Sequence, residues 1–107
     1  MNADIKVKWV AALRSGKYRQ GEGYLQKDGR FCCLGVLCDL LDDKDWRRSW
    51  DEQEAGSLLW GGTGLAIVPD DGLARAGIHP HKAGHLMTMN DTGESFARIA
   101  DWIEKNL

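Results

Sequence analysis

The chain has 107 residues, of which 43% are hydrophobic and 28% are charged, and these values are typical of one globular domain spanning residues 1–107. The formal net charge of −2 excludes the overall basic footprint of a protein that binds duplex nucleic acid. No apolar run is long enough to span a bilayer, so we expect no membrane partner. The N-terminal MNADIKVKWV lacks the apolar segment of a signal peptide, and the cysteine count is odd. Both features favour a reducing, cytoplasmic location.

The first predicted element is a helix over residues 4–14. Apolar side chains recur there at helical spacing and form one stripe. Asn2 or Asp4 is suited to cap its start, and Gly16 stands where a left-handed C-terminal cap is expected.

A β-hairpin follows. Asp28-Gly29 lies between two short runs that carry tyrosine and phenylalanine, and this pattern indicates a two-residue turn. Such a turn pairs Lys27 with Arg30, Gln26 with Phe31, Leu25 with Cys32, and Tyr24 with Cys33. Because an isolated hairpin is only marginally stable, we expect residues 17–20 or 65–68 to add a strand.

The second half of the chain alternates between clear and unclear patterns. A helix is predicted from about residue 33, with its apolar face formed by Leu34, Leu37, Cys38 and Leu41. Residues 44–85 are predicted to be irregular. Within them, Trp46 and Trp50 are expected in a short helix or turn, and one helical turn is expected between Pro69 and Pro80.

The last predicted element is a helix with Ser95 as its N-cap. Its apolar stripe runs to the C-terminus through Phe96, Ile99, Ala100, Ile103 and Leu107. The fold class is therefore α+β, a small single domain with an N-terminal helix, a β-hairpin, a central helix, an irregular middle and a C-terminal helix.

The three cysteines, Cys32, Cys33 and Cys38, raise the question of a zinc site. Structural zinc requires four ligands, usually in two short-spaced pairs. The second pair would have to come from His79, His81 and His85, but the spacings fit no known zinc motif. Cys38 also belongs to the apolar stripe of its helix, where free cysteine packs as a small hydrophobe. We therefore expect no metal and no cofactor.

A thiol nucleophile is the sharper alternative. Cys32 or Cys33 could occupy the N-terminus of the helix, where backbone N–H groups stabilise a thiolate, and one of the histidines would act as base. No sequence signature of a known cysteine nucleophile is present, and the reducing location disfavours a disulfide. The simpler interpretation is that the cysteines belong to the core.

The segment RSGKYRQG, residues 14–21, collects cations around an aromatic ring. Arg14, Lys17 and Arg19 surround Tyr18 there. Such a group suits an anionic planar ligand, whose phosphates meet the cations while its base stacks on the ring. The alternative is structural: Arg14 and Lys17 would neutralise the C-terminal end of the helix, and Tyr18 would fill the core.

The hairpin tip adds Lys27 and Arg30 to these candidates. The negative end of the first helix disfavours an anion on its axis. We therefore expect any bound phosphate beside Arg19, Lys27 or Arg30.

Three blocks, ALRSGKYRQGEGYL, FCCLGVLCDL and MNDTGESFARIADWIEKNL, resemble a group of small proteins of bacteriophage and prophage genomes. The resemblance covers most of the chain, although residues 44–85 match poorly. It implies a phage origin and the cytoplasm of an infected bacterium, and it implies no activity. The polar positions that stand out on its pattern are Arg14, Ser15, Gly16, Tyr18, Gln20, Gly21, Asn90 and Asp91. Gln20, Asn90 and Asp91 thus join the expected ligand-binding residues, although Asn90-Asp91 also suits a turn before the last helix.

Two functions remain open. The first is a phage accessory binding protein without enzymatic activity. It would counteract host defence by sequestering a nucleotide-type signal or by blocking a host protein. A homodimer would supply a second set of the binding groups. The second is a cysteine- or metal-dependent hydrolase. We favour the first.

Overall fold

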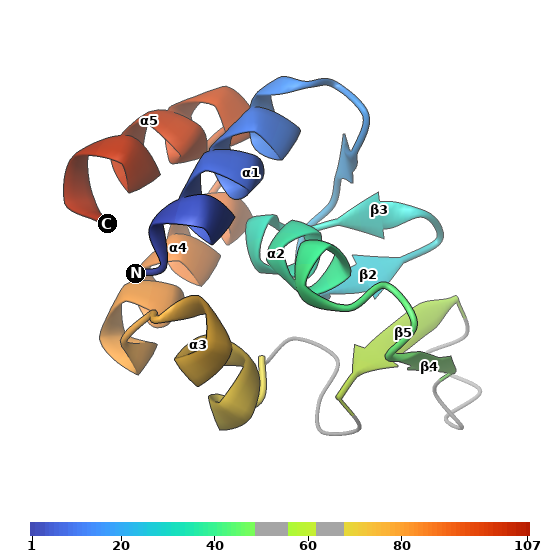
Figure 1. Cartoon of the computed structure of the whole chain (residues 1–107). Coiled ribbons are helices and arrows are strands. Elements are labelled where there is room, and N and C mark those ends of the chain that lie inside the picture. Colours follow the sequence, from blue (N-terminus) through green and yellow to red (C-terminus); the bar gives the residue numbers. More distant parts are fainter. Residues whose placement is uncertain (49–55, 62–67) are drawn as a thin grey trace.

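The computed structural model describes residues 1–48, 56–61 and 68–107. The fold is α+β, as predicted. Its helices are α1 (Ala3–Arg14), α2 (Cys33–Leu41), α3 (Asp70–Ala76), α4 (Pro80–Asp91) and α5 (Phe96–Asn106). Its strands are β1 (Arg19–Gln20), β2 (Gln26–Lys27), β3 (Arg30–Phe31), β4 (Trp46–Arg48) and β5 (Ser57–Trp60). Figure 1 shows most of the helices gathered on one side, the sheet on the other, and α2 between α1 and the sheet.

The two terminal helices form where the sequence predicts them and pack against each other. The side chain of Asn2 caps α1 by accepting from the Ile5 amide at 3.0 Å, and Ser95 caps α5 by accepting from the Arg98 amide at 3.3 Å. Gly16 ends α1 with a φ of 77°, the left-handed conformation that glycine adopts without strain. The predicted stripe of α5 is buried apart from Leu107, which is partly buried.

The central helix α2 is buried nearly all round rather than on one stripe. Cys33, Leu34, Val36, Leu37 and Cys38 are each at most 1% exposed. One side of the helix packs closely on the backbone of Leu25. The contact requires glycine at position 35, because a Cβ there would stand 1.8 Å from the Leu25 carbonyl oxygen. A helix in this position can carry only apolar or small residues, which accounts for the run CLGVLC.

The sheet has the strand order β1-β3-β2-β5-β4. The predicted hairpin is present, with Asp28 and Gly29 both at positive φ in its turn, and Lys27 faces Arg30 as expected. Leu25 still contacts Cys32 through a backbone hydrogen bond of 3.2 Å. The predicted pairing of Tyr24 with Cys33 is wrong, because Cys33 already begins α2.

The expected additional strand lies within residues 17–20. Arg19 and Gln20 form β1, which runs parallel to β3. The alternative at 65–68 lies mostly outside the described residues, and Val68 itself belongs to no strand. The two remaining strands, β4 and β5, were not predicted; β5 pairs with β2 on one side and β4 on the other.

The middle of the chain is more regular than predicted. Trp46 is in β4 rather than in a helix or turn, because its strand pairs with β5, and Trp50 lies outside the described residues. Residues Asp70–Ala76 form two turns of helix α3 instead of one, ended by Gly77 at a φ of 72°. Asn90 and Asp91 close α4 rather than forming the turn before α5.

The buried apolar side chains form a hydrophobic cluster that draws on all the helices, the strand region and the loops. Among residues 1–48, 56–61 and 68–107, no helix is both long enough and apolar enough to cross a membrane.

Candidate anion-binding site

The sheet brings three cations from separate parts of the chain into one line. Arg19 of β1 is the register partner of Arg30 of β3, and Arg30 is in turn the partner of Lys27 of β2. Register partners on neighbouring strands project from the same face of a sheet about 4.8 Å apart, so the three residues span roughly 10 Å. We call Arg19, Arg30 and Lys27 the basic row.

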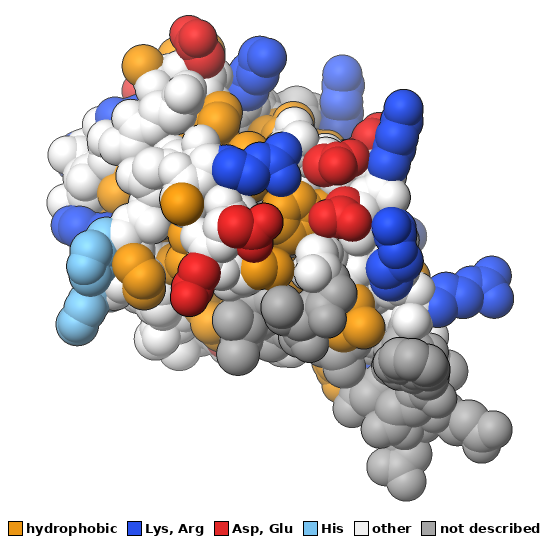
Figure 2. All heavy atoms as spheres, turned by 60° about the horizontal axis from the view of Figure 1, so that its bottom comes forward, with side chains coloured by type: hydrophobic (Ala, Val, Ile, Leu, Met, Phe, Trp, Pro, Cys, Tyr) orange, Lys and Arg blue, Asp and Glu red, His pale blue; other side chains and the backbone are white. Residues whose placement is uncertain are grey.

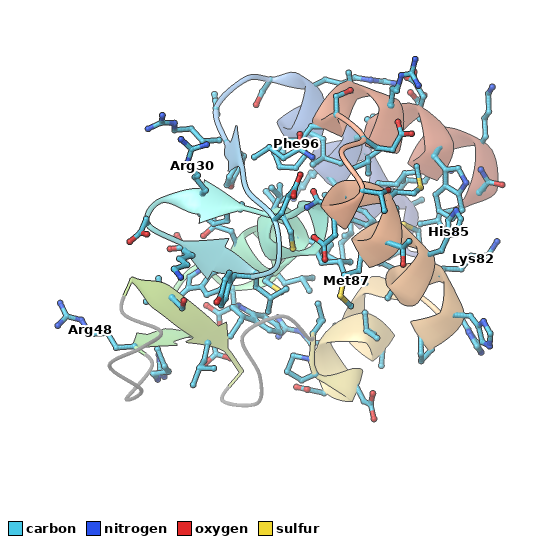
Figure 3. All side chains as sticks on the ribbon, turned by 180° about the vertical axis from the view of Figure 1, so that it is seen from behind. Arg30, Arg48, Lys82, His85, Met87 and Phe96 are labelled. Atoms are coloured by element: carbon cyan, nitrogen blue, oxygen red, sulfur yellow. The ribbon has the colours of Figure 1, made fainter. Side chains whose placement is uncertain are left out.

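The cations of the basic row are accessible. Arg19 and Arg30 are exposed and Lys27 is partly buried. Within the described part of the chain, none of the three forms an ion pair with a carboxylate. Figure 3 shows the Arg30 side chain extending away from the body of the molecule. On the face shown in Figure 2, most Lys and Arg side chains lie on the side of the sheet, whereas the histidines lie at the opposite end.

A hollow of about 170 Å³ adjoins the basic row. We call it the hairpin hollow, and its lining residues are Gly21, Glu22, Tyr24, Lys27, Asp28 and Arg30. The Lys27 ammonium lies 4.5 Å from the centre of the Tyr24 ring, within the range of a cation–π contact. A Cβ at Gly21 would stand 2.8 Å from the Cβ of Arg30, so only glycine lets the chain pass this close to the basic row.

Arg14 and Lys17 lie away from the basic row. The guanidinium of Arg14 forms ion pairs with Asp101 at 2.6 Å and with Glu104, both on α5, and these hydrogen bonds raise its pKa. Arg14 therefore joins the end of α1 to α5. Lys17 lines a separate hollow between α1 and α2, beside Leu40. Neither residue belongs to the group that the sheet assembles.

Tyr18 has a structural position. Its hydroxyl donates a hydrogen bond of 2.6 Å to Asp39, which also accepts from the Trp46 indole at 3.1 Å. Its ring meets the edge of Phe31 at 5.0 Å between centroids. Burial and the hydrogen bond to Asp39 raise the pKa of Tyr18 to about 12. The tyrosine thus fastens the loop to α2, in line with the structural alternative for this residue.

Gln20 and Asn90 hold the loop against the α4–α5 junction. Asn90 is 0% exposed, and its side-chain oxygen accepts from the amide of Gln20 at 3.0 Å and from the backbone N–H of Cys33 at 3.2 Å. Its NH₂ donates to the carbonyl of Gly21 at 2.8 Å. The Gln20 amide also donates to the Glu94 carbonyl at 2.7 Å. Asn90 is fully buried and both its oxygen and its NH₂ have partners, so it has no capacity left for a ligand.

Asp91 contributes to the same connection from the end of α4. Its carboxylate accepts from the backbone N–H of Gly23 at 3.1 Å. The segment from Gln20 to Gly23 is therefore tied to α4 at three successive points. We call this set of contacts, made by Gln20, Asn90 and Asp91, the α4 latch.

The cysteines are buried, as the core interpretation predicts. Cys32 is the N-cap of α2, and its sulfur accepts from the Gly35 amide at 3.3 Å. Burial nevertheless raises the pKa of Cys32 to about 11, and burial raises the pKa of Cys33 and Cys38 as well. Desolvation thus outweighs the helix N-terminus, and the thiols are protonated at neutral pH.

The histidines lie on and before α4, apart from the thiols. His79 stacks on His81 at 5.7 Å between ring centroids, and His85 packs against Trp102 at 4.8 Å. Cys33 does approach α4, where its thiol donates to the Leu86 carbonyl at 3.5 Å. In the parts of the chain that the structure describes, no hydrogen bond joins a cysteine to a histidine, and no group of three potential ligands is placed to hold a metal ion.

The sequence did not indicate Glu22, Tyr24 or Asp28 as parts of the site, and it indicated Gly21 only through the resemblance to phage proteins. The hairpin register already placed Lys27 beside Arg30, and that signal was available in the sequence. The position of Arg19 and of the residues after it depends on the parallel pairing of β1 with β3, which has no local signature.

Fold and site together define a small α+β domain with a mixed sheet that presents a basic row beside a shallow hollow. The chain belongs to the family described as Domain of unknown function (DUF8296), which matches residues 1–64. The matched region contains the basic row and the whole hairpin hollow. No curated protein and no solved structure matches the chain.

Proposed function

We propose that the protein is a non-enzymatic binding protein whose basic row takes an anionic ligand of nucleotide type. The observation that carries the proposal is the register of Arg19, Arg30 and Lys27, which places three cations on one face of the sheet. Two planar guanidinium groups and an ammonium present donors that match phosphate oxygens. The Tyr24 ring beside them adds aromatic surface for a base.

The resemblance to phage proteins extends this proposal to a biological setting. In an infected bacterium, a protein of this kind would sequester a nucleotide-type signal of host defence, and it would act in the cytoplasm. Sequestration requires affinity without turnover, and the site offers cations and an aromatic ring rather than an activated nucleophile.

The test is calorimetric titration of the purified protein with pyrophosphate, nucleoside diphosphates and cyclic nucleotides. We expect binding that weakens with added salt, because the attraction is between exposed charges. Arg30→Ala and Arg19→Ala should each lower the affinity about tenfold, the effect of losing one charge-assisted hydrogen bond. Native mass spectrometry of the same samples reports whether a homodimer forms.

Arg48→Ala is the matched control. Arg48 is also an exposed arginine of the sheet, but its register with Leu58, which pairs with Gln26, places it on the opposite face from Lys27. Its loss should leave the affinity unchanged. If no anion in the panel binds, or if Arg48→Ala lowers the affinity as much as Arg30→Ala, the proposal is wrong.

The competing function, a cysteine-dependent hydrolase, is tested on the same preparation by thiol labelling. A nucleophilic thiol would react with iodoacetamide in the folded protein at pH 7.5. We expect the buried thiols to react only on unfolding, because the thiolate is the reactive form and their raised pKa values suppress it. Rapid labelling of Cys32 or Cys33 in the folded state would favour the hydrolase instead.

A further inference from the structure

The hairpin hollow has a lining that a simple anion does not explain. Besides Lys27 and Arg30 it contains two carboxylates, those of Glu22 and Asp28. A carboxylate repels a phosphate group, so a site for phosphate alone gains nothing from acidic walls. An acidic wall instead favours a ligand that carries N–H donors, because an ionised carboxylate only accepts hydrogen bonds.

Glu22 is the carboxylate best placed to meet such a ligand. Its side chain is exposed, and in the described residues it forms no ion pair. The backbone on both sides of it is fixed: the Gly21 amide donates to the Phe31 carbonyl at 2.8 Å, and the Gly23 amide donates to Asp91. The α4 latch thus holds the base of Glu22 rigidly while its carboxylate stays accessible. Asp28, by contrast, packs against Gly56, where an added Cβ would stand 1.9 Å from its carboxylate oxygen.

The size of the hollow limits what it can hold. Its volume of about 170 Å³ is well below the roughly 300–1,000 Å³ of pockets that enclose a whole drug-sized ligand. A single planar ring system fits this space better than a complete nucleotide does. Phosphates attached to such a ring would lie at the edge of the hollow, between Arg30, which lines it, and Arg19, its neighbour in the basic row.

The bases differ in how they meet a carboxylate. Guanine presents two adjacent donors, N1–H and the N2 amino group, and both can bind one carboxylate at once. Adenine and cytosine place a ring-nitrogen acceptor beside their amino group, and uracil flanks its N–H with two carbonyl oxygens. An acceptor that faces a carboxylate is repelled. A carboxylate on the Watson–Crick edge therefore selects guanine, in the way that single-stranded bases are read on that edge.

We propose that the hairpin hollow takes the guanine base of a guanine nucleotide, with Glu22 accepting from N1–H and N2–H and with the phosphates on Arg30 and Arg19. This inference rests on the proposed function, since it names the ligand class of the same site. The Tyr24 ring supplies aromatic surface beside the base, and Lys27 supplies a donor within the same hollow.

The experiment titrates GDP, ADP, IDP and pyrophosphate into the wild type and into Glu22→Gln, at one fixed salt concentration. We expect GDP to bind at least tenfold more tightly than ADP, and IDP, which lacks the N2 amino group, to fall between them. Glu22→Gln should weaken GDP binding and at the same time strengthen pyrophosphate binding, because it removes an acceptor for the base and a charge that repels phosphate. These opposite signs distinguish base recognition from a general change of charge.

Asp71→Asn is the matched control. Asp71 is an exposed carboxylate of α3 outside the hollow, and Asp71→Asn removes one negative charge just as Glu22→Gln does. It should leave the preference for GDP over ADP unchanged. Thermal melts of both variants establish that they fold. If GDP, ADP and pyrophosphate bind alike, or if Glu22→Gln shifts all of them in one direction, the guanine inference is wrong while anion binding stands. If no ligand binds, the proposed function fails as well.

Discussion

Gly35 lies where α2 approaches the backbone of Leu25 very closely. Any side chain there would collide with the carbonyl of Leu25. Because glycine has no side chain, α2 packs directly on the backbone that precedes β2. The neighbouring Cys32 reinforces this contact, because its N–H donates to the same carbonyl at 3.2 Å. The motif FCCLGVLC therefore follows from close packing and needs no reactive chemistry to account for it.

Gly35→Ala should destabilise the protein strongly, by about 3 kcal/mol or more, because the added methyl group has no space and the obstacle is backbone. Gly84→Ala is the control: Gly84 lies in α4 with no atom within 4 Å of an added Cβ. This substitution should stabilise the protein by up to about 1 kcal/mol through helix propensity. Urea denaturation measures both. A neutral Gly35→Ala variant would show that α2 lies farther from Leu25.

Tyr18→Phe tests the hydrogen bond to Asp39 through its pH dependence. The folded state raises the pKa of Tyr18 from about 10 to about 12, so the hydroxyl stabilises the fold fully below pH 10 and loses this contribution as the pH rises from 10 towards 12. At pH 8 the variant should be less stable by roughly 1 kcal/mol, the usual contribution of one hydrogen bond. The difference between wild type and variant should shrink by pH 11. Urea denaturation at pH 8, 10 and 11 measures it, and a difference that stays constant would contradict the assignment.

At the scale of elements, the α4 latch is what places the loop after α1. The Asn90 side chain forms hydrogen bonds with three separate segments: the loop, α2 and the end of its own helix. Gln20 extends the connection to α5 by accepting from the Phe96 amide at 3.1 Å, which satisfies an N–H group at the start of that helix. The resemblance to phage proteins marked these amides as candidate ligand-binding residues. In the structure they bond to each other and to Asp91, and their other partners are backbone groups.

Asn90→Ala should cost about 3 kcal/mol or more, because it leaves the Gly21 carbonyl and the Cys33 N–H buried without their partner. Asn106→Ala is the matched control: this asparagine is exposed at the end of α5 and bonds only to the Trp102 carbonyl among the described contacts. Its loss should change the free energy of unfolding by less than about 0.5 kcal/mol. Denaturation gives the energies, and faster hydrogen exchange at Gly21 and Gly23 in Asn90→Ala would show that the loop has been released. An Asn90→Ala variant as stable as Asn106→Ala would contradict the latch.

At the scale of the whole molecule, helices and sheet share one cluster of buried side chains. Trp9 of α1, Leu25 before β2, Trp60 of β5 and Leu86 of α4 all belong to it. Trp9 also donates from its indole N–H to the Cys33 carbonyl at 2.9 Å, which connects α1 to the start of α2. A shared core favours folding as one unit rather than as separate helical and sheet parts.

We therefore predict a single cooperative unfolding transition, as expected for one domain of this size. Tryptophan fluorescence reports mainly on the surroundings of the buried indoles, whereas far-UV circular dichroism reports mainly on the helices. Their urea midpoints should coincide. Two midpoints that differ would instead show that parts of the chain unfold separately and that residues 1–107 are not one domain.

Local patterns in the sequence determined the elements whose stabilising contacts lie within a few residues. Asn2 and Ser95 cap their helices through amides three residues on, and the Asp28-Gly29 turn sets the register of Lys27 with Arg30. Burial of Cys38 followed from its place on an apolar stripe. Such interactions depend on backbone geometry over one turn of helix or one hairpin, which neighbouring residue types largely specify.

The tertiary structure alone decided which distant groups meet. Gln20 and Asn90 are 70 positions apart, and the strands β1 and β5 find their partners across intervening helices or loops. The same holds for Arg14, which the sequence presented as an anion ligand and the fold pairs with α5. A polar or charged residue carries the same donors and acceptors whether its partner is a ligand or another part of the chain. Which partner comes within hydrogen-bond distance is decided when folding brings distant segments together. Local sequence periodicity does not predict which segments meet.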